Sequence, residues 1–489
     1  MKHIIKYLYL FVLLFAAENL FSDEIEEVIV TADYRQTDLN KEDSSIFVLD
    51  SEEIKAQPIK HFENLSYLVP NLNFAASDSR ARYFQIRGIG ERSGYLGTPN
   101  TSVGFLIDDV DYSGQAGIAT TFDVEQIEIF NGPQGSRIGA NALAGLIYIK
   151  TKDPTDEFEG TSEITYGDYN TLSTGLAFGG PITKNKNIKF RLALRKDNTD
   201  GFRENLYLNR SDTSSKDETT ARLKLDIELD NKTKAKVLLS QADMDDPADI
   251  WTIDGSLNTL SDRPGMDSQK TDTFGLKVIR ENTYNQFQSL TSTTDTDVVF
   301  SYDADWGNTN SHAPYTYDYF SETLRARESL SQEFRFVSND RYKTERLPFD
   351  WVVGFSYLKL NETNDRQDDG IYGDPNDPFS PYSSLVTSNS DYSSTNISVF
   401  GNIEYEFTGF TKLSLGLRME DWSAKYFDSN DERFNPSDSM MGGKVSLTHA
   451  FDEDKNVFAN YAKGYKQGGF NIGLGLLDST TSSDLEYDP

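Results

Sequence analysis

From residue 158 onwards, apolar and polar side chains alternate with a period of two in thirteen segments that polar stretches separate. Such alternation predicts β-strands with one apolar and one polar face. The connections alternate too, because short links such as 230–233 and 408–411 take turns with long ones such as 294–329 and 361–395. The predicted strands cover residues 159–166, 172–178, 188–196, 221–229, 234–241, 273–280, 286–293, 330–337, 351–360, 396–407, 412–426, 443–451 and 456–465.

The chain before residue 155 has a mixed pattern that predicts an α+β unit. Ser51, followed by two glutamates, can cap a helix, because acidic side chains are favourable at the positive end of the helix dipole. Residues 59–68 predict a second helix that Pro70 ends. A glycine-rich link at 131–145 joins the last two strands and must turn sharply at Asn-Gly-Pro. Strands are predicted at residues 46–49, 82–86, 104–107, 126–130 and 146–151.

Three stretches of this unit carry a family resemblance: QIRGIG at 85–90, VGFLIDDV at 103–110 and EQIEIFNGPQGSRIGANALAGLIYIKTK at 125–152. Together, in this order and spacing, they resemble the plug domain of TonB-dependent outer-membrane receptors. The chain departs from the family pattern at Asn131, where Arg is usual, and at Ile138, where Tyr is usual. The residues that match the signature are Arg87, Gly88, Gly90, Asp108, Gly132, Pro133, Gly135, Arg137, Gly139 and Gly145.

The N-terminus predicts export and a contact segment. Lys2 and Lys6 give the chain a positive start before an apolar core at 7–17. This pattern is typical of a secretory signal, and the core is too short to span a membrane. The β-branched run within EEVIVTA favours an extended strand, and its polar neighbours leave it exposed to add to another protein's sheet edge. The family resemblance implies that this segment is a TonB box, followed by a polar tether at 33–43. The segment consists of Glu26, Glu27, Val28, Ile29, Val30, Thr31 and Ala32.

Composition limits the classes of β protein to which the second half of the chain can belong. A hydrophobic content of 37% and a mean hydropathy of −0.55 would by themselves favour a soluble all-β protein. However, a transmembrane β-barrel has the same low average, since lipid-facing apolar residues alternate with polar ones facing the lumen. Barrels also have short turns on one side and long loops on the other, as predicted here. Past the N-terminus, the sequence has no apolar run long enough for a transmembrane helix.

These observations predict a signal peptide at 1–22, the TonB box and tether at 23–43, an N-terminal α+β plug domain at 44–154 and an antiparallel transmembrane β-barrel at 155–489. The family barrel has twenty-two strands, so the thirteen found here predict an incomplete, C-shaped wall. The strand at 159–166 should then be unpaired on one side, because thirteen strands would close into a barrel too narrow for a plug.

The sequence offers little sign of catalytic chemistry. A net charge of −31 argues against binding nucleic acid. The chain has no cysteine, its four histidines are far apart, and we find no catalytic constellation, so we expect neither an enzyme, nor a cofactor, nor a metal site. Acidic loops at 243–249 and 365–377 could bind a cation, but solvated loops are the simpler interpretation. Arg87 and Arg137 are candidates to pair with carboxylates on the barrel wall.

The resemblance implies an importer in the outer membrane of a Gram-negative bacterium. Its implied partners are outer-membrane lipid, the energising protein TonB on the periplasmic side, and a scarce bulky ligand, with a ferric siderophore favoured over cobalamin, haem or a glycan. Aromatic residues suit ligand capture because they bury a large area at low entropic cost, although a membrane-interface girdle explains them equally well. The ligand-loop candidates are Tyr302, Trp306, Tyr315 and Tyr317. The alternative class is a passive porin or surface-binding protein, against which the plug and EEVIVTA argue.

Overall fold

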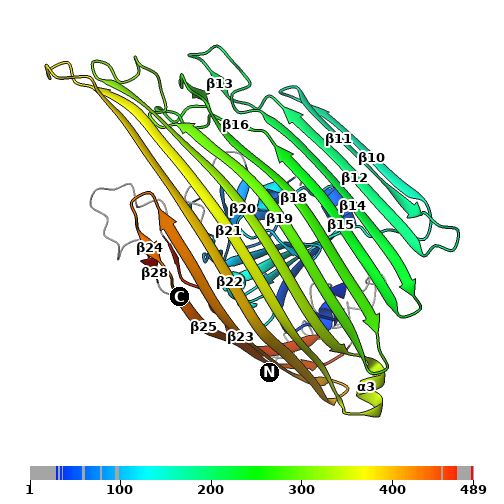
Figure 1. The fold of residues 1–489 in the computed structure, drawn as a ribbon. Coiled ribbons are helices and arrows are strands. Elements are labelled where there is room, and N and C mark those ends of the chain that lie inside the picture. Colours follow the sequence, from blue (N-terminus) through cyan, green and yellow to red (C-terminus); the bar gives the residue numbers. More distant parts are fainter. Residues whose placement is uncertain are drawn as a thin grey trace, which may run out of the picture.

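The computed structural model describes residues 29–30, 34–35, 37–57, 61–76, 80–93, 99–452, 455–470 and 486–487. They form a small mixed domain, the plug, which lies against one face of a large curved antiparallel sheet, the wall (Figure 1). The predicted signal peptide lies outside the described residues. No helix among the described residues is long and apolar enough to cross a membrane.

The plug is built on a five-stranded sheet in the order β3-β8-β9-β6-β7. The two predicted strands at its centre are present and pair with each other, with Ile127 opposite Ile149 and Ile129 opposite Ile147. All four isoleucines are fully buried in the main core cluster. The strands are β3 (Ser45–Asp50), β8 (Val124–Asn131), β9 (Gly145–Thr151), β6 (Val103–Ile107) and β7 (Val110–Asp111).

Short helices and a hairpin surround this sheet. Helix α2 (Ser51–Ala56) is capped by Asp50, not by Ser51, because the Asp50 carboxylate accepts from the backbone of Glu52 and Glu53 while Glu53 accepts from the backbone of Asp50. The predicted α-helix at 59–68 is a 3-10 helix over Phe62–Tyr67. The remaining elements are the hairpin β4 (Leu72–Ala76) and β5 (Ala81–Ile86), and the 3-10 turns Leu39–Lys41, Ala116–Ile118 and Ala140–Ala142.

All thirteen predicted wall strands are present and follow one another in order across the sheet. They are β10 (Glu159–Gly167), β11 (Thr171–Pro181), β12 (Ile188–Thr199), β14 (Lys216–Asp230), β15 (Thr233–Met244), β18 (Gly265–Glu281), β19 (Asn285–Asp303), β20 (Thr316–Ser338), β21 (Phe349–Gly373), β22 (Tyr382–Thr408), β23 (Thr411–Asp428), β25 (Ser437–Ala450) and β26 (Asn456–Lys463).

The wall is an open sheet, as predicted. Within the described ranges, β10 pairs only with β11, and β26 only with β25. The strands β20, β21 and β22 have 23, 25 and 27 residues, so the long connections predicted at 294–329 and 361–395 are largely strand. A membrane crossing needs about 9–11 residues, so these strands continue well beyond one.

The remaining elements are short, and lie at the ends of the wall or beside the plug. One end carries helix α3 (Asp340–Glu345) in the link between β20 and β21, and the other carries the long connections (Figure 1). The remaining strands are β1 (Ile29–Val30), β2 (Thr37–Asp38), β13 (Glu204–Asn205), β16 (Pro247–Ala248), β17 (Asn258–Thr259), β24 (Arg433–Phe434), β27 (Gly469–Phe470) and β28 (Glu486–Tyr487).

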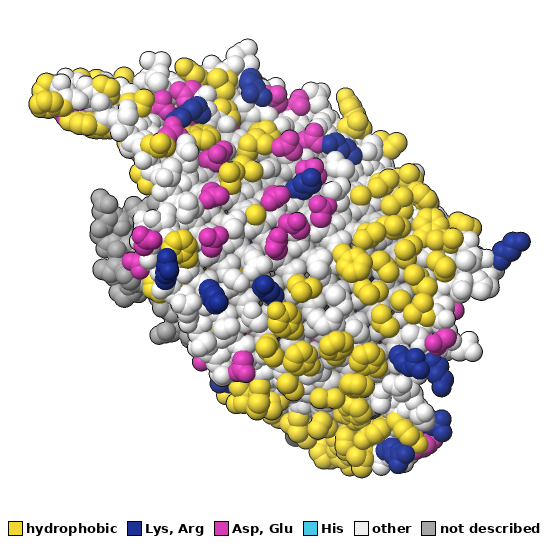
Figure 2. All heavy atoms as spheres, viewed as in Figure 1, with side chains coloured by type: hydrophobic (Ala, Val, Ile, Leu, Met, Phe, Trp, Pro, Cys, Tyr) yellow, Lys and Arg dark blue, Asp and Glu magenta, His cyan; other side chains and the backbone are white. Residues whose placement is uncertain are grey.

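The outer face of the wall, away from the plug, has two zones. Figure 2 shows apolar side chains gathered over the lower and right-hand parts of the wall, and acidic side chains above and to the left of them. The apolar zone fits contact with lipid, because such a surface would be unfavourable in water. Its exposed members include Phe274, Leu330, Phe334, Val353, Phe355, Val399 and Leu417.

Candidate functional site

The plug is anchored to the wall by a buried ion pair next to a buried ring. Arg191 of β12 donates to both carboxylate oxygens of Asp123, at 2.8 and 2.5 Å, and both side chains are at least 97% buried. Arg222 of β14 donates to the backbone oxygen of Asp123 at 3.1 Å. The ring of Phe122 packs against two wall alanines, and a side chain at Gly175 would collide with it. The wall therefore has a socket for these two plug residues.

Further ion pairs hold the plug around its perimeter. Toward the loop end of the wall, the plug supplies arginines to wall carboxylates. Elsewhere it mostly supplies carboxylates to wall lysines. These pairs are Arg80–Glu218, Arg82–Asp267, Asp108–Lys224, Asp109–Lys277, Asp43–Lys444 and Glu91–Lys466.

The two arginines chosen from the sequence behave differently from this set. Arg87 is exposed, because it lies in a tight turn after β5 with a left-handed backbone at φ +54°, so its predicted burial against a wall carboxylate is wrong. Arg137 is partly buried, with its guanidinium 4.8 Å from the ring centre of Phe130 and 6.0 Å from that of Tyr34. The pairing of Arg137 with a wall carboxylate stays a prediction.

The six glycines of the signature fall into three groups. Gly88 and Gly132 lie in turns where, among the described residues, no atom is within 4 Å of an added Cβ, whereas Gly90 and Gly145 pack directly against plug backbone. Gly135 and Gly139 lie against the wall. A Cβ atom on Gly135 would be 3.3 Å from the Cα atom of Gly464, and one on Gly139 would be 2.7 Å from the Glu420 carboxylate. Asp108 closes a turn within the plug by accepting from the backbone of Thr151 at 3.0 Å. The two residues that depart from the family pattern also make contacts within the plug. Asn131 donates to the backbone oxygen of Ser45, and Ile138 packs against an apolar cluster.

The candidate TonB box is only partly described. Glu26, Glu27, Val28, Thr31 and Ala32 lie outside the described residues. Ile29 and Val30 form β1, which pairs with β2, and Val30 is fully buried against Leu106, Phe130 and Leu146 of the plug. The predicted unpaired strand is wrong for both residues. The predicted exposure is wrong for Val30, because the second face of the plug sheet is also apolar and covers it, whereas Ile29 is 40% exposed.

The tether that follows is docked as well. The ring of Tyr34 stacks on Phe400 of β22 at 5.5 Å, and its hydroxyl donates to the backbone oxygen of Arg137 at 3.0 Å. Arg35 pairs with Asp350 at 2.8 Å and donates to the backbone of Trp351 at 3.1 Å. A polar sequence alone did not indicate these contacts, which join the N-terminal segment to both plug and wall.

The four aromatic ligand candidates do not form one group. Tyr302 contacts Trp251 and Phe300, with ring centres 5.1 and 5.4 Å away. Tyr317 contacts Tyr319 and His312, at 4.6 and 5.3 Å. Trp306 and Tyr315 lie between β19 and β20 and are each more than 40% exposed.

A larger aromatic group lies on the inner face of the wall and was not among the candidates chosen from the sequence. Its four rings form four contacting pairs, with ring centres 4.8 to 6.0 Å apart. The pairs are Tyr392–Phe470, Tyr426–Phe434, Tyr426–Phe470 and Phe434–Phe470. The inward positions Trp422, Ala424 and Tyr426 of β23 are all buried, so the alternation of this strand could have indicated it.

A buried ion pair lies beside this aromatic group. The Arg327 Nε donates to Glu362 at 2.6 Å, and Glu362 is directly opposite Tyr392 in the sheet. Arg327 also donates to the backbone oxygen of Ser113 at 3.3 Å, which links this part of the wall to the plug.

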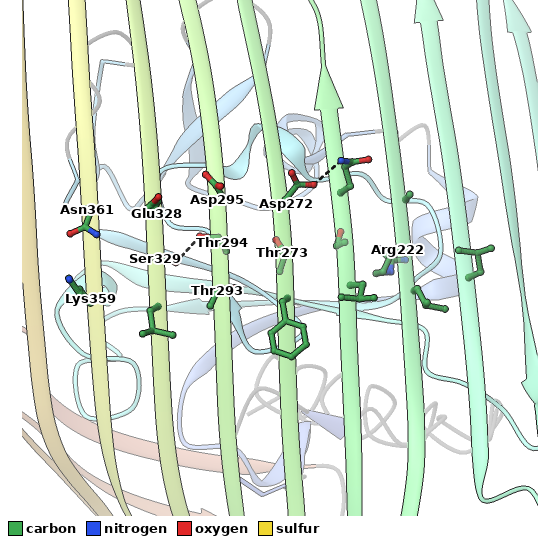
Figure 3. A pocket seen from close by; sticks show the side chains of 18 residues that line it. Arg222, Asp272, Thr273, Thr293, Thr294, Asp295, Glu328, Ser329, Lys359 and Asn361 are labelled. Atoms are coloured by element: carbon green, nitrogen blue, oxygen red, sulfur yellow. Dashed lines mark hydrogen bonds between the residues drawn. The ribbon is translucent and has the colours of Figure 1, made fainter.

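The outer face carries a broad trough of about 820 Å³ at the border of its two zones (Figure 3). Its lining includes three acidic residues directly opposite one another on neighbouring strands, Asp272, Asp295 and Glu328. Phe274 and Leu330, two positions further from the loop end, also line it. Among the described residues, no cluster of His, Cys, Asp or Glu could hold a metal ion. The trough faces away from the plug and therefore does not belong to the plug–wall interface.

The protein thus combines a plug domain with a long-stranded antiparallel wall, and comparison with known proteins defines the class. Residues 38–146 match the model of the TonB-dependent receptor plug domain, and residues 148–486 match that of the TonB-dependent receptor-like β-barrel. The chain belongs to the TonB-dependent receptor family.

Individual relatives are distant. The pesticin receptor of Yersinia pestis is 21% identical over 492 residues, covering 96% of this chain and 68% of the relative. The ferripyoverdine receptor of Pseudomonas aeruginosa is 24% identical over 148 residues, covering 30% of this chain and 18% of the relative. The fold is similar to that of the ferric yersiniabactin uptake receptor FyuA from Yersinia pestis, with a TM-score of 0.72 and 18% identity over 88% of this chain and 66% of that one. This chain therefore spans about two thirds or less of these proteins.

Acid should loosen the plug only far below neutral pH. Burial alone would raise the pKa of Asp109, but the nearby cations Lys277 and Arg335 outweigh it and lower that pKa to about 2. The pKa values of Asp43 and Asp153 are lowered in the same way, by Lys444 and by Lys224 against burial. Such carboxylates stabilise docking fully above their unfolded pKa of about 4, and the effect disappears as the pH falls toward 2. We expect leak conductance in planar bilayers to be flat from pH 8 to 5 and to rise below pH 4. A rise between pH 7 and 6 would contradict this assignment.

Proposed function

We propose that the protein is an outer-membrane receptor that imports a bulky ligand, with a ferric siderophore as the favoured ligand, and that TonB supplies the energy. The observation that carries this is the plug, which is held against the inner face of the wall by a buried socket and a perimeter of ion pairs. A passive pore has no use for such a plug. An energised importer needs one that is stable at rest and can be displaced.

The proposal assigns a role to each part of the chain. Residues 1–22 direct export, 23–43 carry the TonB box and tether, 44–154 form the plug, and 155–489 belong to the membrane wall. The apolar outer zone supports placement in the lipid of a Gram-negative outer membrane. The names of one relative and one structural neighbour, a ferripyoverdine receptor and a ferric yersiniabactin uptake receptor, support a ferric siderophore as the ligand.

The proposed ligand-capturing surfaces are the inner aromatic group and the aromatic contacts of Tyr302 and Tyr317 near the loop end of the wall. Rings that contact one another, with centres about 5 Å apart, present rigid area at low entropic cost. The buried Arg327–Glu362 pair lies between the inner group and the plug, so it is placed to couple ligand contact to the plug.

Deletion of residues 26–32 should abolish energised uptake while leaving ligand bound at the cell surface. The reason is that the segment is the proposed contact site for TonB, and its described residue Val30 packs against the plug and not against the proposed ligand-capturing surfaces. Binding and uptake of radiolabelled ferric siderophore by whole cells measure the two effects separately. The control is Val28→Ile, which keeps a β-branched apolar strand and should transport normally. Undiminished uptake by the deletion variant would instead favour the passive porin.

A further inference from the structure

The interface between plug and wall contains a cavity that the anchors described above do not account for. It has a volume of about 300 Å³ and lies between the plug turn 108–110 and the inner faces of β14, β15, β18, β19 and β20. Cationic and acidic side chains line it in equal numbers. A space this polar has room for about ten water molecules at their liquid volume. It can therefore hold a hydrated solute or the polar part of one.

Ion pairs between plug and wall form part of its lining. Lys277 of β18 holds Asp109 at 2.8 Å, and Lys224 of β14 holds Asp108 at 3.3 Å and Asp153 at 2.5 Å. An acidic group on a solute could replace Asp109 as the partner of Lys277. The exchange would preserve one charge-assisted contact while freeing the plug turn.

Toward the loop end, the cavity is closed by a narrow seam of contacts between plug and wall. Most of them are uncharged, and the exception is Arg327 of β20, which donates to the backbone oxygen of Ser113 at 3.3 Å. A Cβ atom on Gly275 of β18 would lie 3.6 Å from the Cγ2 atom of Val110. The Tyr112 hydroxyl donates to Thr273 at 2.8 Å, and Gln269 donates to the backbone of Gln115 at 3.1 Å. Neutral contacts of this kind are weaker than the ion pairs that hold the plug elsewhere.

The inward positions of the wall behind the seam carry small residues. Gly275, Ser292 and Ser331 lie directly opposite one another on β18, β19 and β20, and all three line the cavity. The next inward positions toward the loop end are Thr273, Thr294 and Ser329, which are also small and hydroxylated. Displacing the plug segment 110–115 would thus uncover a continuous polar surface.

We propose that the transported ligand crosses along the inner faces of β18, β19 and β20, through this cavity, when plug segment 110–115 moves away from Gly275 and Thr273. This inference rests on the proposed import function. It adds that the route is local to one side of the plug and suits a solute with acidic groups. The socket at Phe122 and Asp123 stays closed during passage.

A disulfide staple tests the route. The chain has no native cysteine, so the pair Val110→Cys and Gly275→Cys introduces the only thiols. The matched control staples the other side of the plug through Ser136→Cys and Gly416→Cys, where the Cβ atoms would be 3.2 Å apart. Both distances allow a disulfide after small shifts. Uptake and surface binding of labelled ferric siderophore are measured with and without reductant.

We expect the 110–275 staple to reduce uptake at least tenfold, with recovery on reduction, and the 136–416 staple to leave uptake within twofold of the unstapled protein. Surface binding should persist in both. Free transport through the 110–275 staple overturns the route, and so does a block by both staples, because the plug would then move as one body. Absence of energised uptake in the unstapled protein would count against the proposed function itself.

A second pair of variants keeps the inference testable if a staple does not form. Ser292→Trp fills the proposed route, whereas Thr293→Trp places the same ring on the outer face one residue later. Ser292→Trp should lower uptake at least tenfold with surface binding unchanged, and Thr293→Trp should have little effect. Equal uptake by the two variants would overturn the inference.

Discussion

Replacement of Asp123 by alanine should loosen the plug by about 3–5 kcal/mol, the usual cost of breaking a buried ion pair from one side. The substitution leaves the Arg191 guanidinium almost fully buried without its two-point partner. We expect the lower end of this range, because Glu159 still accepts from Arg191 at 2.6 Å. Hydrogen exchange of plug amides and leak conductance in planar bilayers should both increase, since each depends on release of the plug.

The matched control is Asp156→Ala. Asp156 also pairs with a wall cation, Lys189 at 3.2 Å, but its side chain is 67% exposed. Exposed pairs contribute about 0–1 kcal/mol, so leak and exchange should hardly change. Phe122→Ala should resemble Asp123→Ala, and the double variant should cost less than the sum because the two residues share one socket. An unchanged leak for Asp123→Ala would show that the socket does not hold the plug.

The alternation of apolar and polar residues predicted every wall strand but not where the strands end. β20 was predicted from residue 330, yet it begins at Thr316. Beyond Leu330 toward the loops, outward Glu328 and Glu322 alternate with inward Arg327 and Arg325. Both faces are polar there, so the sequence has no period-two signal although the backbone ladder continues.

The plug signature was found from sequence, but its anchors were not. Arg82 and Arg87 are five residues apart, yet only Arg82 reaches a wall carboxylate, Asp267, because it lies within β5 and Arg87 lies in the turn after it. The partners are separated by 185 residues in this case and by 68 in the case of Asp123 and Arg191. Charge pairing over such distances depends on how plug and wall meet, which no local pattern encodes.

The same limit explains Val30. A β-branched run between polar residues favours an exposed strand, and only the packing of the plug sheet shows a second apolar face. Leu106, Phe130 and Leu146 occupy this face, at positions that alternate with the main core. A sheet buried on both faces could have been suspected from the continuous apolar run at Leu146 to Ile149.

Replacement of Gly145 by alanine should destabilise the plug strongly, by about 2–6 kcal/mol, from backbone strain of 1–3 and overpacking of 1–3. Gly145 opens β9 with φ +158°, and a Cβ atom there would lie 2.3 Å from the backbone oxygen of Phe130 and 2.7 Å from the Cδ1 atom of Ile86. Neither the backbone of β8 nor a fully buried isoleucine can move without disturbing the central sheet.

Gly132 provides the matched control, because it belongs to the same signature and also has a positive φ, +98°, but has open space around it. Gly132→Ala should cost only the conformational term of about 1–2 kcal/mol. We expect hydrogen exchange of β8 and β9 amides to accelerate much more in Gly145→Ala than in Gly132→Ala, and leak conductance to follow the same order. Equal effects would mean that conformation alone, and not close packing at the start of β9, requires glycine in this signature.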